Sequence, residues 1–152
     1  MNNKRELTSA QTAQCGVLLT RYKLLFQGVE SVAMPIEIGI DLVAYSEKAG
    51  RVVPVQVRTN LKPTRARVRG RMALAWTIQR DTPAELAALA DLSTNRVWLL
   101  TMEQFFDLAQ QKRPRNAQLS LLTDLAAGSE EDEAGFGQFE QYLLENRASE
   151  LF

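Results

Sequence analysis

The chain has 152 residues, of which 45% are hydrophobic, and its 18 lysines and arginines balance 18 aspartates and glutamates. This length supports one domain with a hydrophobic core and is too short for two substantial domains. With no histidine and one cysteine, the sequence excludes an internal disulfide, a zinc site of the histidine and cysteine type, and Ser–His or Cys–His catalysis. It shows neither a long apolar run nor a secretion signal, so we expect a cytoplasmic protein that does not enter the membrane.

The first part of the chain predicts one helix followed by three strands. Apolar residues near helical spacing predict a helix over residues 8–27. Short strands are expected over 31–36 and 40–46. A third strand over 51–59 has apolar residues on both faces, which is typical of a strand at the centre of a sheet. Pro54 is unusual there and indicates a bulge or an unpaired position.

A basic segment follows the third strand, and it reflects an uneven distribution of charge. Residues 1–80 contain 13 lysines and arginines and 5 acids, whereas residues 81–152 contain 5 and 13. This asymmetry indicates a nucleic-acid surface on the basic side, since clustered arginines bind phosphates well. The cations assigned to that surface are Lys62, Arg65, Arg67, Arg69 and Arg71. The alternative is a solvated loop that keeps the protein soluble.

The second half predicts further elements, in the order strand, helix, strand and then helices. Their expected ranges are 74–79 (strand), 83–92 (helix), 96–101 (strand), and 102–111, 116–126 and 139–146 (helices). We therefore expect the sheet to be complete by Thr101. Residues 1–112 would form the core, and 113–152 a helical C-terminal extension of the same domain with an acidic linker at 128–137.

Three polar residues interrupt the apolar strands of the first half. Gln56 and Arg58 are two residues apart in a strand, so their side chains point to the same face. If residues 40–46 and 51–59 pair as a hairpin, Asp41 lies on that face as well. A carboxylate, an amide and a cation would then meet at one place.

The segments Gly39-Ile40-Asp41-Leu42-Val43 and Val55-Gln56-Val57-Arg58-Thr59 resemble the Asp…(Glu/Gln)-x-Lys signature of the PD-(D/E)XK nuclease superfamily. The resemblance covers about residues 8–101. It is strongest to small stand-alone members with glutamine at the second position, such as resolvase-like proteins and the homing endonucleases of bacterial introns. It implies an α/β, restriction-endonuclease-like αβββαβ core, in which helices flank a mixed central sheet, with C-terminal helices added. It also implies metal-dependent cleavage of DNA.

By this resemblance, Asp41 is the metal-binding aspartate and would bind Mg²⁺ or Mn²⁺. Gln56 matches the second position, and the backbone carbonyl of Val57 would be a further metal ligand. Arg58 stands where the family has a lysine that stabilises the negative charge of the phosphoryl transition state. The possible accessory residues are Gln14, in place of a helix glutamate, and Glu37, in the turn before Asp41.

Two functions follow from the resemblance. The first is a metal-dependent DNA endonuclease, and because nucleases that cut both strands often work as symmetric oligomers, it would be a homodimer or a higher homo-oligomer. The second is a catalytically inactive protein of the same fold that binds nucleic acid or a protein partner, since arginine is not equivalent to lysine at position 58. The three polar residues could also form a salt-bridged group under the sheet, because buried charges are tolerated when they are paired.

Overall fold

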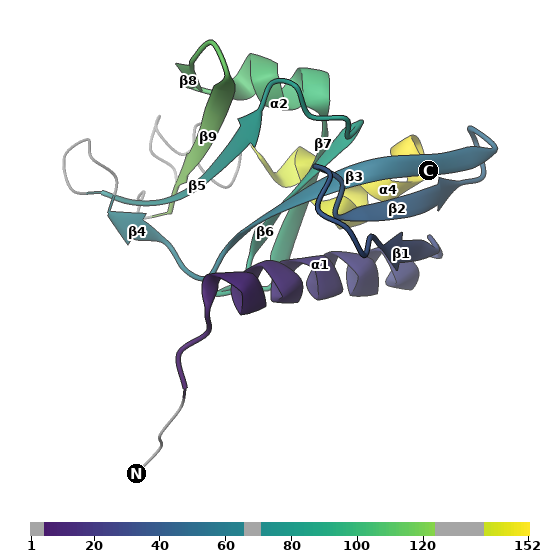
Figure 1. The fold of residues 1–152 in the computed structure, drawn as a ribbon, viewed down its shortest axis with the longest axis horizontal. Helices are drawn as coiled ribbons and strands as arrows, with labels where there is room; N and C mark the ends of the chain where they lie inside the picture. The colour runs from purple at the N-terminus through teal and green to yellow at the C-terminus, as the bar shows by residue number, and fades with distance from the viewer. Residues whose placement is uncertain (1–4, 66–70, 124–138) are drawn as a thin grey trace.

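The computed structural model describes residues 5–65, 71–123 and 139–152, which form two sheets flanked by helices (Figure 1). Sheet A has the strand order β1-β2-β3-β6-β7, and sheet B has the order β4-β5-β9-β8. The strands are β1 (Ser31–Ala33), β2 (Leu42–Ser46), β3 (Arg51–Asn60), β4 (Thr64–Arg65), β5 (Met72–Gln79), β6 (Leu86–Asp91), β7 (Arg96–Thr101), β8 (Gln111–Lys112) and β9 (Asn116–Leu122). The helices are α1 (Ser9–Phe26), α2 (Met102–Leu108), the 3-10 turn η2 (Glu140–Tyr142) and α4 (Leu144–Leu151).

Helix α1 begins after Thr8, whose hydroxyl accepts a hydrogen bond from the backbone of Gln11 while the Gln11 side chain accepts one from the Thr8 backbone. The helix covers one face of sheet A and packs against the core that contains Val53, Val55 and Val57. Its approach to β3 is close. A Cβ atom on Gly16 would lie 1.7 Å from the hydroxyl oxygen of Thr59, so only glycine fits this position without a shift of the helix or of the threonine.

Strand β3 is central in sheet A, as its two apolar faces predict. It pairs antiparallel with β2 and parallel with β6. Pro54 is accommodated because the pairing with β6 begins only at Val55, opposite Leu86. The carbonyl of Pro54 still accepts a hydrogen bond from the backbone of Glu85, at 2.9 Å.

Sheet B packs on the other face of sheet A. The side chains of Leu74, Trp76 and Ile78 on β5 are buried in a core shared with β6, β7 and α2. Trp76 and Trp98 meet edge to face, with ring centroids 5.6 Å apart, and the Trp76 indole donates a hydrogen bond to the carbonyl of Ala90. The two tryptophans therefore join sheet B to sheet A. Sheet A itself separates the core under α1 from the core that it shares with sheet B.

Two predicted helices are wrong. Residues 86–91 form strand β6, in which every residue is buried, because this run lies between the two cores and both of its faces are covered. Residues 116–122 form strand β9, in which Ala117, Leu119 and Leu121 are buried at a period of two. In both runs the tertiary environment overrides a sequence that favours helix. The sheet structure is consequently not complete at Thr101, and the segment after residue 112 begins with a strand.

The remaining predictions fare better. The α/β fold with a mixed central sheet, flanking helices and a helix at the C-terminal end is confirmed. Helix α2 is shorter than expected, and 139–146 forms η2 and the start of α4. The proposed acidic linker at 128–137 lies outside the described residues. Within the described ranges, no helix is long and apolar enough to cross a membrane.

Candidate active site

Asp41 immediately precedes β2 and is fixed to β3 by two hydrogen bonds. Its backbone N–H donates to the carbonyl of Val55 at 3.0 Å, and its Oδ2 accepts from the backbone N–H of Val57 at 2.7 Å. The pairing of β2 with β3 begins at Leu42, opposite Val55, and the Asp41 N–H bonds to that same Val55, so Asp41 lies just beyond the regular pairing. Val53, Val55 and Val57 belong to the core under α1, so Gln56 and Arg58, which alternate with them along β3, lie on the face of sheet A that is turned away from α1.

The loop that leads to Asp41 is held by a contact at Gly39. This residue has a φ of +82°, and a Cβ atom there would lie 2.9 Å from Cδ of Pro83. A larger residue would be strained by the backbone and by this contact. The close approach brings the loop before Asp41 against the connection between β5 and β6.

The connection between β5 and β6 supplies Thr82, a residue of the site that no sequence pattern indicated. Gln56 is only 5% exposed, and its Oε1 accepts a hydrogen bond from the hydroxyl of Thr82 at 2.9 Å. The same hydroxyl oxygen accepts from the backbone of Ala84 at 3.2 Å, so its proton is directed to Gln56. The amide of Gln56 is therefore oriented, with its NH₂ group turned away from Thr82. Sequence reasoning assigned Thr82 no role, because the neighbouring Pro83 indicated a helix.

Arg58 is half-buried, and its Nε is buried without a hydrogen-bond partner. Within the described ranges, its guanidinium forms no ion pair, either with Asp41 or with any other acid. Leaving a buried donor unpaired costs about 1–3 kcal/mol. The three polar residues thus do not form the salt-bridged group that the sequence allowed, because the Asp41 carboxylate and the Arg58 guanidinium do not neutralise each other.

The site offers oxygen atoms to a cation. One carboxylate oxygen of Asp41 remains after Oδ2 has bonded to Val57. The carbonyl of Val57 points to the same edge of β3 as its N–H, so it is directed towards Asp41. Hard divalent cations such as Mg²⁺ and Mn²⁺ favour oxygen ligands of this kind. The part of the chain that the structure describes contains no cluster of three or more His, Cys, Asp or Glu side chains that could hold a metal, so further ligands would be water and substrate oxygens.

The accessory residues are less closely tied to this site. Gln14 is exposed on α1, and Glu37 is exposed in the loop before Asp41. Neither side chain has a hydrogen bond or an ion pair with another described residue, and their roles stay predictions. In the basic segment, Lys62 and Arg65 are exposed at β4, and Arg71 is half-buried where β5 begins. Arg67 and Arg69 lie outside the described residues.

No protein-family model matches this chain, and no curated protein sequence matches it. Among solved structures, the chain is similar to the bacterial homing endonuclease I-Ssp6803I, with a TM-score of 0.59 and 12% sequence identity. The match covers 96% of this chain and 100% of that chain. At this identity the similarity establishes the fold alone. The protein therefore has the fold of a known nuclease, and the matched part of the chain includes sheet B as well as sheet A.

Proposed function

We propose that the protein is a metal-dependent DNA endonuclease of the PD-(D/E)XK superfamily that hydrolyses phosphodiester bonds. The observation that carries the proposal is the unneutralised pair of charges: Asp41 is held by a backbone N–H, and Arg58 has no acidic partner among the described residues. An acid and a cation that do not pair with each other are available for a metal ion and a phosphate. The bacterial homing endonuclease of similar fold supports this proposal.

The proposed cation ligands are the free carboxylate oxygen of Asp41 and the carbonyl of Val57. A bound divalent cation such as Mg²⁺ or Mn²⁺ would supply Lewis acidity, which neutralises phosphate charge and acidifies water. The hydrogen bond from Val57 fixes the Asp41 carboxylate, so little reorganisation is needed before a cation binds.

Arg58 would act on the phosphate. Its guanidinium carries donors that match phosphate oxygens, and it is not deprotonated in proteins, so it cannot serve as a general base. Its role is electrostatic: it would stabilise the charge that builds on the phosphoryl oxygens in the transition state. Gln56, whose amide is oriented by Thr82, would donate its NH₂ group to the same region.

DNA is the proposed partner, held by the cations Lys62, Arg65 and Arg71 together with Arg67 and Arg69 of the same segment. Nucleases that cut both strands often work as symmetric oligomers, so we propose a homodimer or a higher homo-oligomer. The replacement of lysine by Arg58 and the single carboxylate favour one other candidate function, that of an inactive nucleic-acid-binding protein with this fold.

A nicking assay on supercoiled plasmid in Mg²⁺ or Mn²⁺ tests the proposal. Asp41→Asn retains an acceptor for Val57 but removes the charge, and it should lower the cleavage rate by about a hundredfold or more. Asp107→Asn, at an exposed position of α2, is the matched control and should cleave at the wild-type rate. Wild-type cleavage by Asp41→Asn would disprove the assigned site. If the folded wild-type protein cuts no form of DNA, the endonuclease function is disproved, and the inactive nucleic-acid-binding protein is the candidate that remains.

A further inference from the structure

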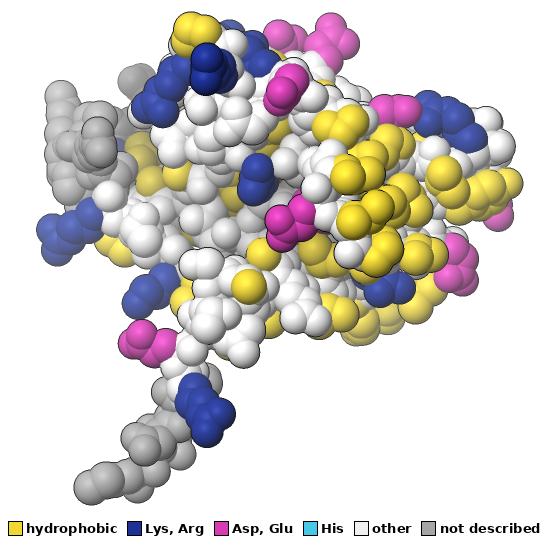
Figure 2. Space-filling model, in the orientation of Figure 1, with side chains coloured by type: hydrophobic (Ala, Val, Ile, Leu, Met, Phe, Trp, Pro, Cys, Tyr) yellow, Lys and Arg dark blue, Asp and Glu magenta, His cyan; other side chains and the backbone are white. Residues whose placement is uncertain are grey.

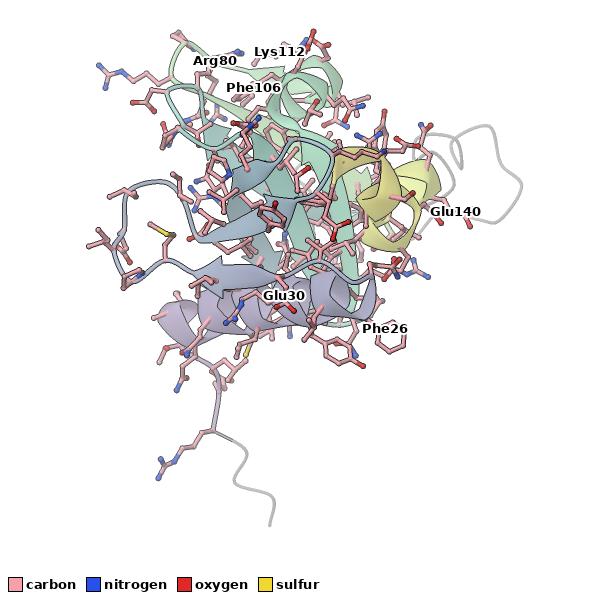
Figure 3. The ribbon with its side chains drawn as sticks, turned by 90° about the vertical axis from the view of Figure 1, so that its right-hand side faces the viewer. Phe26, Glu30, Arg80, Phe106, Lys112 and Glu140 are labelled. Carbon is pink, nitrogen blue, oxygen red and sulfur yellow. The ribbon has the colours of Figure 1, made fainter. Side chains whose placement is uncertain are left out.

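Helix α1 exposes large apolar side chains on the side that faces away from sheet A. We call this group the outer stripe, and its members are Leu18, Tyr22, Leu25 and Phe26. Their exposed fractions run from 55% to 79%. Residues three or four positions apart lie on the same side of a helix, so these side chains form one stripe, while the buried Gly16, Thr20 and Leu24 lie on the opposite side. Figure 3 shows Phe26 projecting from the end of α1, away from the sheets.

The outer stripe carries no charge, although the solvent side of a surface helix normally does. Helix α1 contains two charged residues, and both bind to other parts of the same chain. Arg21 donates to the carbonyl of Ser31 at 3.1 Å, on the edge strand β1. Lys23 forms an ion pair with Glu145 of α4, at 2.5 Å. The described part of the chain thus leaves the outer stripe open to solvent, with no charge that would oppose its burial.

The sequence of α1 also has the period of a helix that packs against a second helix. Five residues follow one another at alternating intervals of four and three: Gln11, Cys15, Leu18, Tyr22 and Leu25. This is the heptad spacing of a coiled-coil seam. The residues of α1 that are buried on sheet A are a separate set, so the fold of a single copy does not need this seam. The spacing indicates that the partner of the outer stripe is another helix.

The area of the outer stripe is close to what one partner of a stable dimer buries. A whole leucine side chain offers about 60–120 Å² and an aromatic one about 150–250 Å², so at these exposed fractions the stripe offers about 400 Å². A standard interface buries about 800 Å² per partner, and about 65% of a homodimer interface, or roughly 500 Å², is apolar. The stripe therefore supplies most of the apolar area that a homodimer needs.

A second exposed apolar group lies on sheet A, and Figure 2 shows yellow side chains on the right, where β2 and β3 are drawn in Figure 1. Its exposed members include Val32, Ile36, Tyr45 and Val52. Tyr45 pairs with Val52, and both alternate with residues of the core under α1, so they lie on the face that carries Gln56. A second copy bound there would stand beside the candidate active site. The outer stripe lies on the opposite side of sheet A and leaves that face free.

We propose that two copies of this chain form a dimer through the outer stripe, with α1 of one copy packed against α1 of the other. The contact is self-complementary, as a two-fold interface requires, because the same uncharged apolar stripe is present on both copies. The polar residues beside the stripe, such as Gln11, lie at the rim of the interface. The interface thus uses the face of the molecule that the candidate active site does not.

This arrangement has a consequence for the two active sites, which rests on the proposed endonuclease function. Gln56 and Arg58 lie on the face of sheet A that is turned away from α1, so the two sites face outward on opposite sides of the dimer. Two α-helices, each about 10 Å across, lie between them, which places the sites more than about 20 Å apart. The grooves of B-DNA are about 6 and 12 Å wide, so phosphates across one groove are closer together than this. The dimer therefore holds two separate DNA segments, one at each site.

Sedimentation equilibrium without DNA tests the interface independently of the nuclease function. The wild type should have twice the mass of one chain. Leu18→Glu/Leu25→Glu places two acids in each stripe and should raise the dissociation constant of the dimer at least about a hundredfold. Ile36→Glu/Val52→Glu, the matched control, makes the same change in the second apolar group and should remain a dimer. A wild type that stays monomeric, or a control that dissociates as much as the α1 variant, would overturn the inference.

A variant of opposite charge separates loss of contact from misfolding. Leu18→Lys/Leu25→Lys should be monomeric by itself, as the glutamate variant is. An equal mixture of the two variants should recover the dimer, because opposite charges then meet across the interface. If both variants keep the circular dichroism of the wild type and their mixture stays monomeric, the two stripes are not in contact and the inference is wrong.

A capture experiment in EDTA tests the placement of the two active sites. Wild-type protein should retain a fluorescent duplex on beads that carry a second duplex, whereas Leu18→Glu/Leu25→Glu should bind a single duplex without linking two. Equal retention by both proteins would overturn the placement of the sites on opposite sides. A protein that dimerises through the stripe but neither binds nor cuts DNA disproves the endonuclease function alone. A monomer that cuts DNA disproves the dimer while the active site stands.

Discussion

The contact between Gly16 and Thr59 makes a quantitative prediction about how α1 is seated on β3. In Gly16→Ala the new Cβ would lie 1.7 Å from Oγ1 of Thr59 and 2.8 Å from its Cβ, so helix and strand must separate. Overpacking of this kind costs about 1–3 kcal/mol. Alanine in the middle of a helix regains about 1 kcal/mol over glycine. Since a contact of 1.7 Å is severe, we expect a net loss of about 1–2 kcal/mol in the free energy of unfolding.

Urea unfolding, followed by the fluorescence of the buried Trp76 and Trp98, measures this loss. Ala13→Gly, at an exposed position of α1, measures the difference in helix propensity between alanine and glycine. It should lower the free energy of unfolding by about 1 kcal/mol. Thr59→Ala removes a buried hydroxyl that has no partner and should be close to neutral. Because it also removes the worst contact, Gly16→Ala/Thr59→Ala should regain about 1 kcal/mol over Gly16→Ala. If Gly16→Ala instead raised the free energy of unfolding by about 1 kcal/mol, as the higher helix propensity of alanine alone would, the close contact between α1 and β3 would be disproved.

Three further predictions concern the site and its surroundings. Thr82→Val should lower the cleavage rate about threefold to tenfold by releasing the Gln56 amide, whereas Thr82→Ser should retain it; equal rates for both variants would show that the hydroxyl has no role. Arg58→Lys should raise the free energy of unfolding by about 1 kcal/mol in urea titrations, because it removes a buried donor without a partner, and a loss would mean that the guanidinium is held by contacts of its own. The Arg51 hydrogen bond lowers the pKa of Glu85, so this pair stabilises the fold above the ordinary carboxyl pKa and the stabilisation is lost as the pH falls through the lowered pKa. Between neutral and acid pH, Glu85→Gln should therefore lose slightly less free energy of unfolding than the wild type. If salt at about 1 M left this difference between the two proteins unchanged, the Arg51–Glu85 ion pair would not be its cause.

The first half of the fold could be predicted because its signals are local. Thr8 and Gln11 form a capping box at the predicted start of the helix, and the alternating valines of residues 51–59 place this strand at the centre of the sheet. The second half misleads because its local preferences and its environment disagree. The Leu-Ala-rich run of β6 favours a helix, but both of its faces are buried, and an extended strand is what allows α1 and sheet B to pack on opposite sides.

Local sequence is enough to predict which residues can share a site. The spacing of Gln56 and Arg58 places both side chains on one face through the period of a β-strand, and the pairing of β2 with β3 brings Asp41 to the backbone of Val57. What these residues bond to depends on the tertiary structure, because the decisive contacts join segments far apart in the chain. Thr82 reaches Gln56 from the connection after β5, and no described acid reaches Arg58. Sheet B likewise exists only because residues 116–122 pair with 73–79, a pairing that no local pattern could specify.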